Sequence, residues 1–358
     1  MSQQYMMKGN EALAEAALRA GCRYFFGYPI TPQTELSAYM SKRMPKIGGT
    51  FLQAESEIAA INMVLGASSV GARVMTSSSS PGISLKTEGI SYIAGSDLPC
   101  LIVNVQRGGP GLGGIQPSQA DYYQATKAPG HGDLHILVFA PASIQEIVDL
   151  TGRAFDKADH YRMPAMLLAD GALGQMMEPI SFPDESEEMK LPEKPWAATG
   201  TEGKRKPNII NSLYLNPNKL EDSVRARFER YETIRKNEVL YEEMMTEDAD
   251  LVLVAYGITS RICKTAVKKA RAEGIKLGLI RPVTLWPFPE EVISRTAEHV
   301  KAFLSVEMSM GQMVDDVRLA VNGKCPVRFF GRTGGVIPTP DEVFDAAKDV
   351  LASAGGDK

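Results

Sequence analysis

Cysteine and histidine are scarce in this 358-residue chain, which holds four of each. The cysteines Cys22, Cys100, Cys263 and Cys325 are far apart and form no Cys-x-x-Cys pair. Iron–sulfur clusters and structural zinc sites need grouped thiolates, so we expect no metal site built from this chain alone. We interpret the four cysteines as isolated free thiols.

An excess of basic charge and a long apolar run are also missing. The chain carries 39 Lys and Arg against 43 Asp and Glu, and this balance disfavours nucleic acid as a partner. No apolar run approaches the roughly 20 residues that span a bilayer, and the first ten residues contain no apolar signal core. We therefore expect a cytoplasmic globular protein that binds neither nucleic acid nor a membrane.

Strand-like and helix-like segments alternate in two parts of the chain, which predicts two α/β domains. Such alternation is typical of a doubly wound parallel sheet. We expect a first domain over residues 1–183, a connector over 184–246 and a smaller α/β domain over 247–358. Within the connector, residues 184–206 are rich in Glu, Lys and Pro and are expected to be exposed, whereas 220–245 is expected to be a charged helix.

Each segment is assigned from its apolar pattern and its boundary residues. Thr31 is expected to cap a helix that opens at Pro32. The other predicted helices cover residues 11–20, 57–69, 83–94, 143–159, 260–273, 290–297 and 312–321. The predicted strands cover residues 22–28, 49–52, 74–77, 98–105, 134–140, 165–169, 251–256, 276–282 and 300–306.

Polar residues follow the first predicted strands and form a candidate site. Ligands of open parallel sheets bind beyond the carboxyl ends of the strands, so these side chains would meet at one rim. Individually, Thr31 also fits a helix cap, Glu57 an exposed acid at a helix start, and Arg107 a surface arginine. The rim candidates are Thr31, Glu55, Glu57, Ser77 to Ser80, Arg107 and His131.

A glycine-rich loop follows one of these strands. Gly109, Gly111 and Gly114 match the Gly-x-Gly-x-x-Gly pattern of dinucleotide-binding folds. Pro110 inside the loop and Pro117 after it argue against a helix that opens at the last glycine. A nicotinamide-dependent dehydrogenase that uses the loop Gly109 to Gly114 is nevertheless kept as an alternative. The chain has no Gly-x₄-Gly-Lys-Ser/Thr motif, which excludes a P-loop.

Several motifs, in this order, resemble the alpha subunit of the 2-oxoacid:ferredoxin oxidoreductase family. They lie at residues 27–34 (GYPITPQT), 53–60 (QAESEIAA), 76–82 (TSSSSPG), 105–111 (VQRGGPG), 130–133 (GHGD) and 280–289 (IRPVTLWPFP). The chain is most similar to the branched-chain, 2-oxoisovalerate (3-methyl-2-oxobutanoate) type. The resemblance implies a thiamine-diphosphate-binding, pyrimidine-type doubly wound sheet and a smaller transketolase C-terminal-like α/β domain.

The resemblance also implies roles for the rim residues. Glu57 matches the glutamate that hydrogen-bonds N1′ of the aminopyrimidine, with Glu55 as a nearby competitor. Arg107 matches the arginine that holds the substrate carboxylate, and Thr31 matches the threonine that hydrogen-bonds the substrate. By the same resemblance, further residues are expected to line the site, at the cofactor or at the substrate: Ser79, Ser80, Pro81 and His131.

Cofactor and partner assignments follow from what the chain lacks relative to this family. The family holds the diphosphate and Mg²⁺ with a Gly-Asp-Gly motif, and the nearest fragment here is Asp170-Gly171. The resemblance therefore implies thiamine diphosphate shared with a beta subunit that carries the diphosphate, Mg²⁺ and an iron–sulfur cluster. A small ferredoxin-like subunit, a gamma subunit and ferredoxin are the further implied partners.

The implied reaction is oxidative decarboxylation of a 2-oxoacid, with coenzyme A as co-substrate, to acyl-CoA, CO₂ and reduced ferredoxin. Leu112 stands where 2-oxoglutarate members often carry a hydroxyl residue, which favours 2-oxoisovalerate over 2-oxoglutarate, the alternative substrate. The run 280–289 is interpreted as packing and subunit contact. A non-catalytic scaffold subunit with the same fold is a further alternative.

Overall fold

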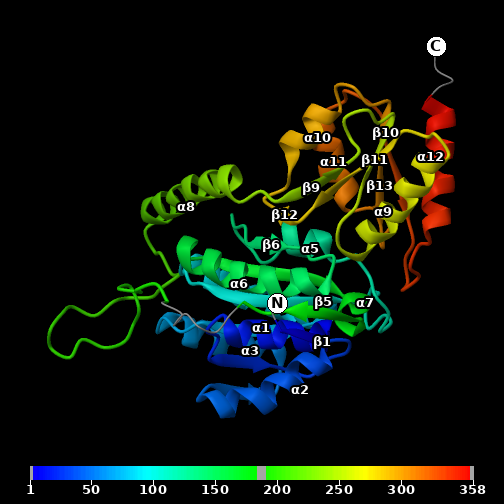
Figure 1. Ribbon diagram of the computed structural model, residues 1–358. Coiled ribbons are helices and arrows are strands. Elements are labelled where there is room, and N and C mark those ends of the chain that lie inside the picture. Colours follow the sequence, from blue (N-terminus) through cyan, green and yellow to red (C-terminus); the bar gives the residue numbers. More distant parts are fainter. Residues whose placement is uncertain (1–2, 184–190, 355–358) are drawn as a thin grey trace.

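Two helix-covered sheets make up the computed structural model, which describes residues 3–183 and 191–354 (Figure 1). The larger sheet runs in the order β12 (Thr284–Trp286), β6 (Leu137–Phe139), β7 (Pro164–Asp170), β5 (Cys100–Gln106), β4 (Val74–Ser78), β2 (Tyr24–Gly27) and β3 (Thr50–Gln53). Every neighbouring pair in it is parallel except β12 with β6. The predicted doubly wound parallel sheet is confirmed.

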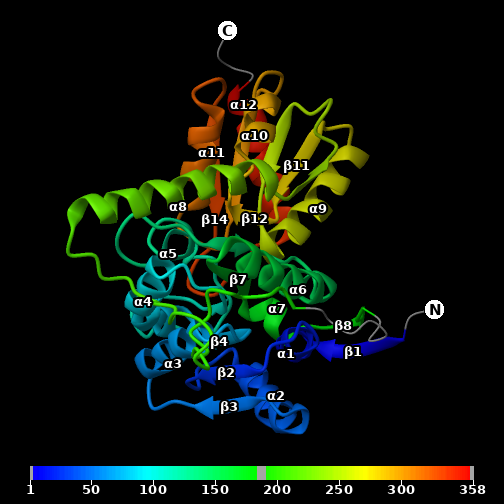
Figure 2. The same ribbon diagram turned by 90° about the vertical axis from the view of Figure 1, so that its left-hand side faces the viewer.

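Helices cover both faces of the larger sheet (Figure 2). α3 (Glu57–Ser69) packs on α4 (Ser80–Gly95), while α1 (Gly9–Arg19) packs on α2 (Thr34–Arg43) and on α6 (Ile144–Tyr161). The remaining helices of this part are η1 (Met44–Ile47), α5 (Tyr122–Thr126) and α7 (Gly171–Gln175). Across the described ranges, no helix combines the length and the apolar character that crossing a membrane requires.

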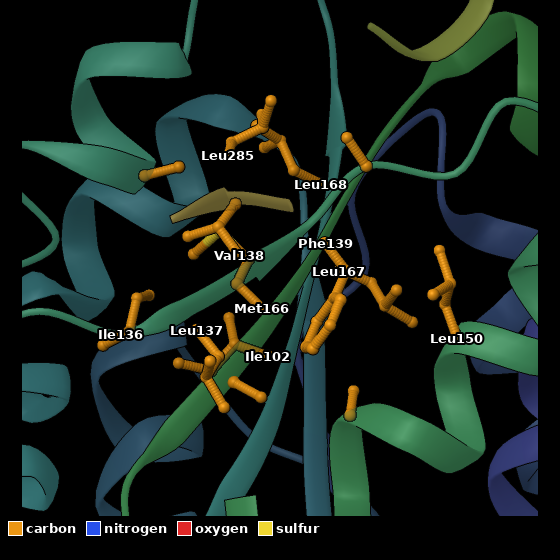
Figure 3. Close-up of a cluster of buried hydrophobic side chains, with 14 of the residues drawn as sticks. Ile102, Ile136, Leu137, Val138, Phe139, Leu150, Met166, Leu167, Leu168 and Leu285 are labelled. Atoms are coloured by element: carbon orange, nitrogen blue, oxygen red, sulfur yellow. The ribbon is translucent and has the colours of Figure 1, made fainter. Parts of the chain in front are cut away.

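The core of the larger sheet is apolar on both faces because helices bury both. All seven residues of β5 and all seven of β7 are buried. Figure 3 shows Phe139 of β6 close to Leu167 of β7, with Leu150 of α6 on the same side, and Ile102 of β5 beside Met166. Burying each such side chain contributes about 1.5–3 kcal/mol relative to exposure, so these central strands are the firm base from which the rim loops project.

The smaller sheet runs in the order β14 (Val327–Gly331), β13 (Ala302–Glu307), β10 (Leu251–Val254), β11 (Leu277–Pro282) and β9 (Tyr241–Met244). Its helices are α9 (Gly257–Ala272), α10 (Glu290–Thr296), α11 (Met313–Val321) and α12 (Pro340–Ala354). After β11 the chain adds β12 to the edge of the larger sheet. The run 280–289 thus joins the two sheets, and the buried Arg281 binds both carboxylate oxygens of Glu146 at 2.8 and 2.9 Å.

Some boundaries differ from the sequence prediction. The helix predicted over 220–245 is wrong in its last part, because α8 (Pro217–Asn237) ends and residues 241–244 pair with β11 as strand β9. The predicted cap at Thr31 is also wrong, because α2 begins at Thr34 and Gln33 precedes it as the cap residue. The antiparallel pair β1 (Gln4–Lys8) and β8 (Met177–Ser181), with α5, α7, α12, β12 and β14, was not predicted.

The connector is described only from residue 191 onward, so its first seven residues, 184–190, lie outside the described residues. Most of residues 191–206 are exposed, in agreement with the prediction. Trp196 anchors this stretch, since the Arg162 guanidinium lies 4.6 Å from the centre of its ring. Lys194 adds an ion pair to the buried Asp159.

Gln119 is a buried link between the two sheets. Its side-chain Nε2 donates to the Tyr256 carbonyl at 2.8 Å, and its Oε1 accepts from the Met308 N–H and the Thr259 hydroxyl, both at 3.0 Å. These partners lie next to β10 and β13 of the smaller sheet, so one amide joins two parts of the chain that are far apart in sequence.

Replacing Gln119 with alanine should therefore destabilise the protein. Gln119→Ala leaves the buried Met308 N–H unpaired, while the Tyr256 carbonyl keeps the Thr259 hydroxyl as a donor, and we expect the free energy of unfolding to fall by about 1–3 kcal/mol. Urea unfolding followed by circular dichroism measures this loss. Gln116→Ala, which truncates an exposed side chain three residues earlier, is the control; equal stability of the two variants would contradict the assigned role.

Candidate active site

The candidate site lies at the point where the larger sheet changes its direction of growth. β3 and β4 follow each other in sequence but lie on opposite sides of β2, and such a switch point is where open α/β sheets bind ligands. A buried hydrogen bond marks the place, because the Ser77 hydroxyl donates to Gln33 Oε1 at 2.6 Å. Thr31 and Arg107 follow β2 and β5 in the loops at this rim, and Glu57 begins the helix that follows β3.

Glu57 is the first residue of α3, whose start is fixed by Ser56 accepting the Ala59 N–H at 3.1 Å. Contrary to its interpretation as an exposed acid, Glu57 is only 6% exposed, whereas Glu55 is exposed. Its carboxylate lies against Gly82 of α4, where an added Cβ would stand 2.6 Å from Glu57 Oε1. No described residue hydrogen-bonds this carboxylate, and its oxygens are not among the fully buried polar atoms that lack a partner, so the carboxylate is accessible to a ligand.

The serine turn, Ser77 to Ser80 between the end of β4 and the start of α4, contains two orphaned hydroxyls. Ser78 Oγ and Ser79 Oγ are buried and have no hydrogen-bond partner among the described residues. Ser80 differs, because its hydroxyl accepts the Arg107 N–H at 3.0 Å and donates to Asp121 Oδ2 at 2.6 Å. An unpaired buried hydroxyl costs about 1–3 kcal/mol, so polar groups left this way at a rim fit a site that a ligand completes.

Pro81, the second residue of α4, has no donor of its own and fixes the start of that helix. Gly82 follows it, and an added Cβ there would stand 2.0 Å from Ser78 Oγ. The absence of a side chain at Gly82 therefore leaves the space in which Glu57 and Ser78 meet.

Arg107 lies just after β5 and is 7% exposed. Its two terminal nitrogens donate to the Thr31 carbonyl at 3.0 Å and to the Leu112 carbonyl at 3.1 Å. Its Nε is buried and has no partner in the described part of the chain. A guanidinium that is fixed by two carbonyls and whose buried Nε–H is unused is suited to holding a carboxylate. The exposed Thr31 lies at the same place, because its carbonyl accepts one of these two hydrogen bonds from Arg107.

His131 is not brought to these residues. It is exposed, its ring stands edge-on to Tyr92 at 6.0 Å, and its carbonyl accepts from Ser91 Oγ at 2.7 Å. Ser91 lies eleven residues after Ser80 on α4, which corresponds to about 16 Å along the helix. His131 therefore lies beside the second half of α4, away from the helix start where Glu57 packs.

The glycine loop does not have the geometry of a dinucleotide site. The Gly114 N–H donates to the Gly108 carbonyl at 2.9 Å, which closes the loop on itself, and the next helix, α5, begins only at Tyr122. Gly113 has a φ of +58°, and an added Cβ there would lie 1.8 Å from Gly108 O. These glycines are needed to close the turn, and no helix N-terminus receives a pyrophosphate here.

Asp170 and the cysteines are occupied by structural roles. The Asp170 carboxylate caps α7 by accepting the N–H groups of Ala172 and Leu173, and burial raises its pKa to about 6. Burial also raises the pKa values of the Cys22 and Cys100 thiols to about 12. Within residues 3–183 and 191–354, no three His, Cys, Asp or Glu side chains are grouped as a metal site would require.

Four residues in or near this rim were not singled out from the sequence: Gln33, Ser78, Lys86 and Asp121. Ser78 belonged to a serine run in which the sequence could not tell paired from unpaired hydroxyls. Lys86 is fully buried in α4, although a lysine between polar and apolar helix residues normally predicts exposure. The signal that could have found it is its position one helical turn after Gly82.

Two family models match the chain. Residues 15–246 match "Pyruvate flavodoxin/ferredoxin oxidoreductase, thiamine diP-bdg", and residues 249–343 match "Pyruvate:ferredoxin oxidoreductase core domain II". Ketoisovalerate oxidoreductase subunit VorB of Methanothermobacter marburgensis is 52% identical over 330 residues, which cover 92% of this chain and 93% of that protein. 2-Oxoglutarate synthase subunit KorA of the same organism is 38% identical, covering 96% and 98% of the two chains.

Solved structures share the fold of this chain. The 2-oxoglutarate:ferredoxin oxidoreductase from Magnetococcus marinus, with 2-oxoglutarate, coenzyme A and succinyl-CoA bound, matches with a TM-score of 0.86 at 28% identity. The match covers 97% of this chain and 65% of that chain, so this chain spans less than two thirds of that protein. A split-gene transketolase shares the fold at 16% identity, with a TM-score of 0.62 and coverage of 97% and 98%.

These matches confirm the resemblance seen in the sequence motifs and the expected pyrimidine-type and transketolase-like α/β fold. The matched thiamine-diphosphate-binding region, residues 15–246, contains Glu57, the serine turn and Arg107. The chain belongs to the 2-oxoacid:ferredoxin oxidoreductase family, as a subunit that carries the thiamine-diphosphate-binding domain.

Proposed function

We propose that this chain is the alpha subunit of a thiamine-diphosphate-dependent 2-oxoisovalerate:ferredoxin oxidoreductase. The enzyme converts the 2-oxoacid and coenzyme A to acyl-CoA, CO₂ and reduced ferredoxin. The observation that carries the proposal is Glu57, a side chain only 6% exposed whose carboxylate has no hydrogen-bond partner among the described residues and lies beside the orphaned Ser78 hydroxyl. Its oxygens are therefore free to accept a hydrogen bond from a ligand.

The residues present fit an aminopyrimidine ring. Glu57 holds a proton at N1′ of the ring, Gly82 leaves room beside it, and the hydroxyls of Ser78 and Ser79 supply polar contacts. When bound, thiamine diphosphate supplies the nucleophilic carbon and the electron sink for decarboxylation. Arg107 orients the substrate carboxylate through its unused Nε–H, with Thr31 beside it.

An aliphatic substrate is favoured by the surroundings of Arg107. The Leu112 carbonyl accepts a hydrogen bond from the guanidinium, so this residue neighbours Arg107, and its side chain is 83% exposed. An apolar side chain there suits a branched aliphatic group better than a second carboxylate. The ketoisovalerate relative is also more similar to this chain than the 2-oxoglutarate relative, at 52% against 38% identity. 2-Oxoglutarate is the alternative.

Partner subunits complete the enzyme in this proposal. Because Asp170 is committed to capping α7, a beta subunit holds the diphosphate and Mg²⁺ and carries an iron–sulfur cluster. A small ferredoxin-like subunit and a gamma subunit add to the complex, and ferredoxin takes the electrons. The four cysteines support this division, since three of them are buried singly in this chain.

Glu57 should be essential, while its neighbour Glu55 should not be. In the assembled complex, Glu57→Gln removes the acid–base group and should lower kcat by at least about 10²-fold. Glu55→Gln, a matched change two residues away on an exposed side chain, should leave kcat within about twofold. Steady-state rates of 2-oxoisovalerate-dependent electron transfer measure both. Full activity of Glu57→Gln would instead indicate the non-catalytic scaffold subunit.

Arg107 should act on the substrate. Arg107→Ala removes the charged partner of the carboxylate, so kcat/KM for 2-oxoisovalerate should fall roughly 10- to 100-fold, mainly through KM. Arg225→Ala, which removes an exposed arginine of α8, is the control and should behave as wild type. Unchanged kinetics of Arg107→Ala would remove this residue from the site.

Substrate preference should follow the side chain at position 112. For the wild-type complex, kcat/KM should be highest for 2-oxoisovalerate among 2-oxoisovalerate, 2-oxoglutarate and pyruvate. Leu112→Ser should lower the ratio of kcat/KM for 2-oxoisovalerate to kcat/KM for 2-oxoglutarate by about 10-fold, the usual effect of losing one small apolar contact. Competition assays with paired substrates measure the ratio, and a wild-type preference for 2-oxoglutarate would select the alternative.

A further inference from the structure

Asp121, which has no role in the proposed mechanism, lies two hydrogen bonds away from Arg107. It is the residue before α5, and its side chain is partly buried. One carboxylate oxygen, Oδ2, accepts the Ser80 hydroxyl at 2.6 Å and the Asn104 side-chain N–H at 2.9 Å. Since these donors belong to α4 and β5, a single oxygen joins the start of a helix to the end of a central strand.

The Ser80 hydroxyl connects Asp121 to the main chain of Arg107. A hydroxyl that gives its hydrogen to a carboxylate keeps its lone pairs for an incoming donor, and the Arg107 N–H fills that place at 3.0 Å. The Arg107 carbonyl is the competing acceptor of the hydroxyl, at the longer distance of 3.2 Å. The Ser80 N–H also donates to Asn104 Oδ1 at 3.1 Å, so Asp121, Ser80 and Asn104 form a closed ring of hydrogen bonds.

The main chain at Arg107 determines where its guanidinium stands. The two terminal nitrogens reach the carbonyls of Thr31 and Leu112, and the unused Nε–H is the donor assigned to the substrate. A group that binds a reacting substrate must be held to within about 0.5 Å, and a misplacement of about 1 Å can cost about 10²-fold in rate. The contact between Ser80 and Arg107 therefore bears on substrate binding.

The Asp121 carboxylate is a fixed acceptor because its own main chain is held on both sides. Its N–H donates to Gln106 Oε1 at 3.1 Å. Gln312, the residue before α11 of the smaller domain, donates to the Ala120 carbonyl at 2.7 Å and accepts the Tyr123 N–H at 2.8 Å. The smaller domain thus sets the position of Asp121 from the residues on either side of it.

We propose that Asp121 is a positioning residue for the 2-oxoacid substrate, because it fixes the main chain of Arg107 through the Ser80 hydroxyl and so aims the guanidinium at the substrate carboxylate. This role rests on the proposed function of Arg107. It involves no proton transfer by Asp121. Its loss therefore weakens the binding of the 2-oxoacid and leaves turnover at saturating substrate largely intact.

Steady-state kinetics of the assembled complex test this role. Asp121→Ala should lower kcat/KM for 2-oxoisovalerate roughly 10-fold through KM, with kcat within about twofold of wild type. Asp121→Asn keeps an oxygen that can accept both hydrogen bonds and should restore kcat/KM to within about threefold of wild type. Asp222→Ala, which removes an exposed carboxylate of α8, is the control and should behave as wild type.

A double-mutant cycle distinguishes positioning from a merely structural role. If Asp121 acts through Arg107, its removal costs nothing further once the guanidinium is gone, so Asp121→Ala in the Arg107→Ala background should change kcat/KM by less than about twofold. Calorimetric titration of the cofactor-free complex with thiamine diphosphate should give the same affinity for Asp121→Ala and wild type, to within about threefold. A merely structural role would add its full loss in the double variant and weaken the cofactor affinity as well.

A second variant decides the matter if Asp121→Ala does not assemble. Ser80→Ala removes the connecting hydroxyl and should raise KM for 2-oxoisovalerate to a similar extent, again with kcat retained. A wild-type KM in the assembled variants, no recovery in Asp121→Asn, additive losses in the cycle, or a weakened cofactor affinity would each overturn the inference.

These outcomes are distinct from failure of the proposed function. If Arg107→Ala raises KM while Asp121→Ala and Ser80→Ala leave it unchanged, the role of Arg107 stands and only that of Asp121 fails. If Arg107→Ala itself has wild-type kinetics, Arg107 does not bind the substrate, and the inference fails together with that part of the proposed function.

Discussion

The rim of the larger sheet is built around Glu57, a side chain that is only 6% exposed and whose carboxylate has no hydrogen-bond partner among the described residues. Its position depends on Ser56, which fixes the first turn of α3, and on Gly82, whose missing side chain makes the space. The carboxylate is therefore available to a ligand that can donate or share a proton, as an aminopyrimidine nitrogen can.

The second sheet supports the same site from a distance. Gly335, which follows β14, packs so closely on Gln116 that an added Cβ would lie 2.3 Å from the Gln116 Cβ. Gln116 in turn accepts the Gly108 N–H with its carbonyl, directly beside Arg107. The smaller domain thus braces the loop that carries the substrate-binding arginine, and Gln119 locks the two sheets together three residues later. This bracing gives the transketolase-like domain a role without chemistry of its own.

Local patterns in the sequence predicted the parts that local physics decides. The prediction of a helix over 57–69 matches α3 to its terminal residues, and the structure shows that its start is set locally by the Ser56 cap. Non-local features were missed: β12 pairs with a strand almost 150 residues earlier, and Thr31 is positioned by Arg107 instead of capping a helix. The burial of Glu57 and Lys86 depends on how α3 and α4 pack, which no single segment encodes. Motif resemblance named Glu57, Thr31 and Arg107, but only the structure separates the paired Ser80 from the orphaned Ser78 and Ser79.

The most direct measurement is the structure of the assembled complex with thiamine diphosphate bound. The account predicts that a Glu57 carboxylate oxygen lies within about 3.2 Å of N1′ of the aminopyrimidine, at a boundary between this chain and the subunit that holds the diphosphate. A ring that binds elsewhere, with Glu57 packed only against Gly82 and its own helices, would contradict it.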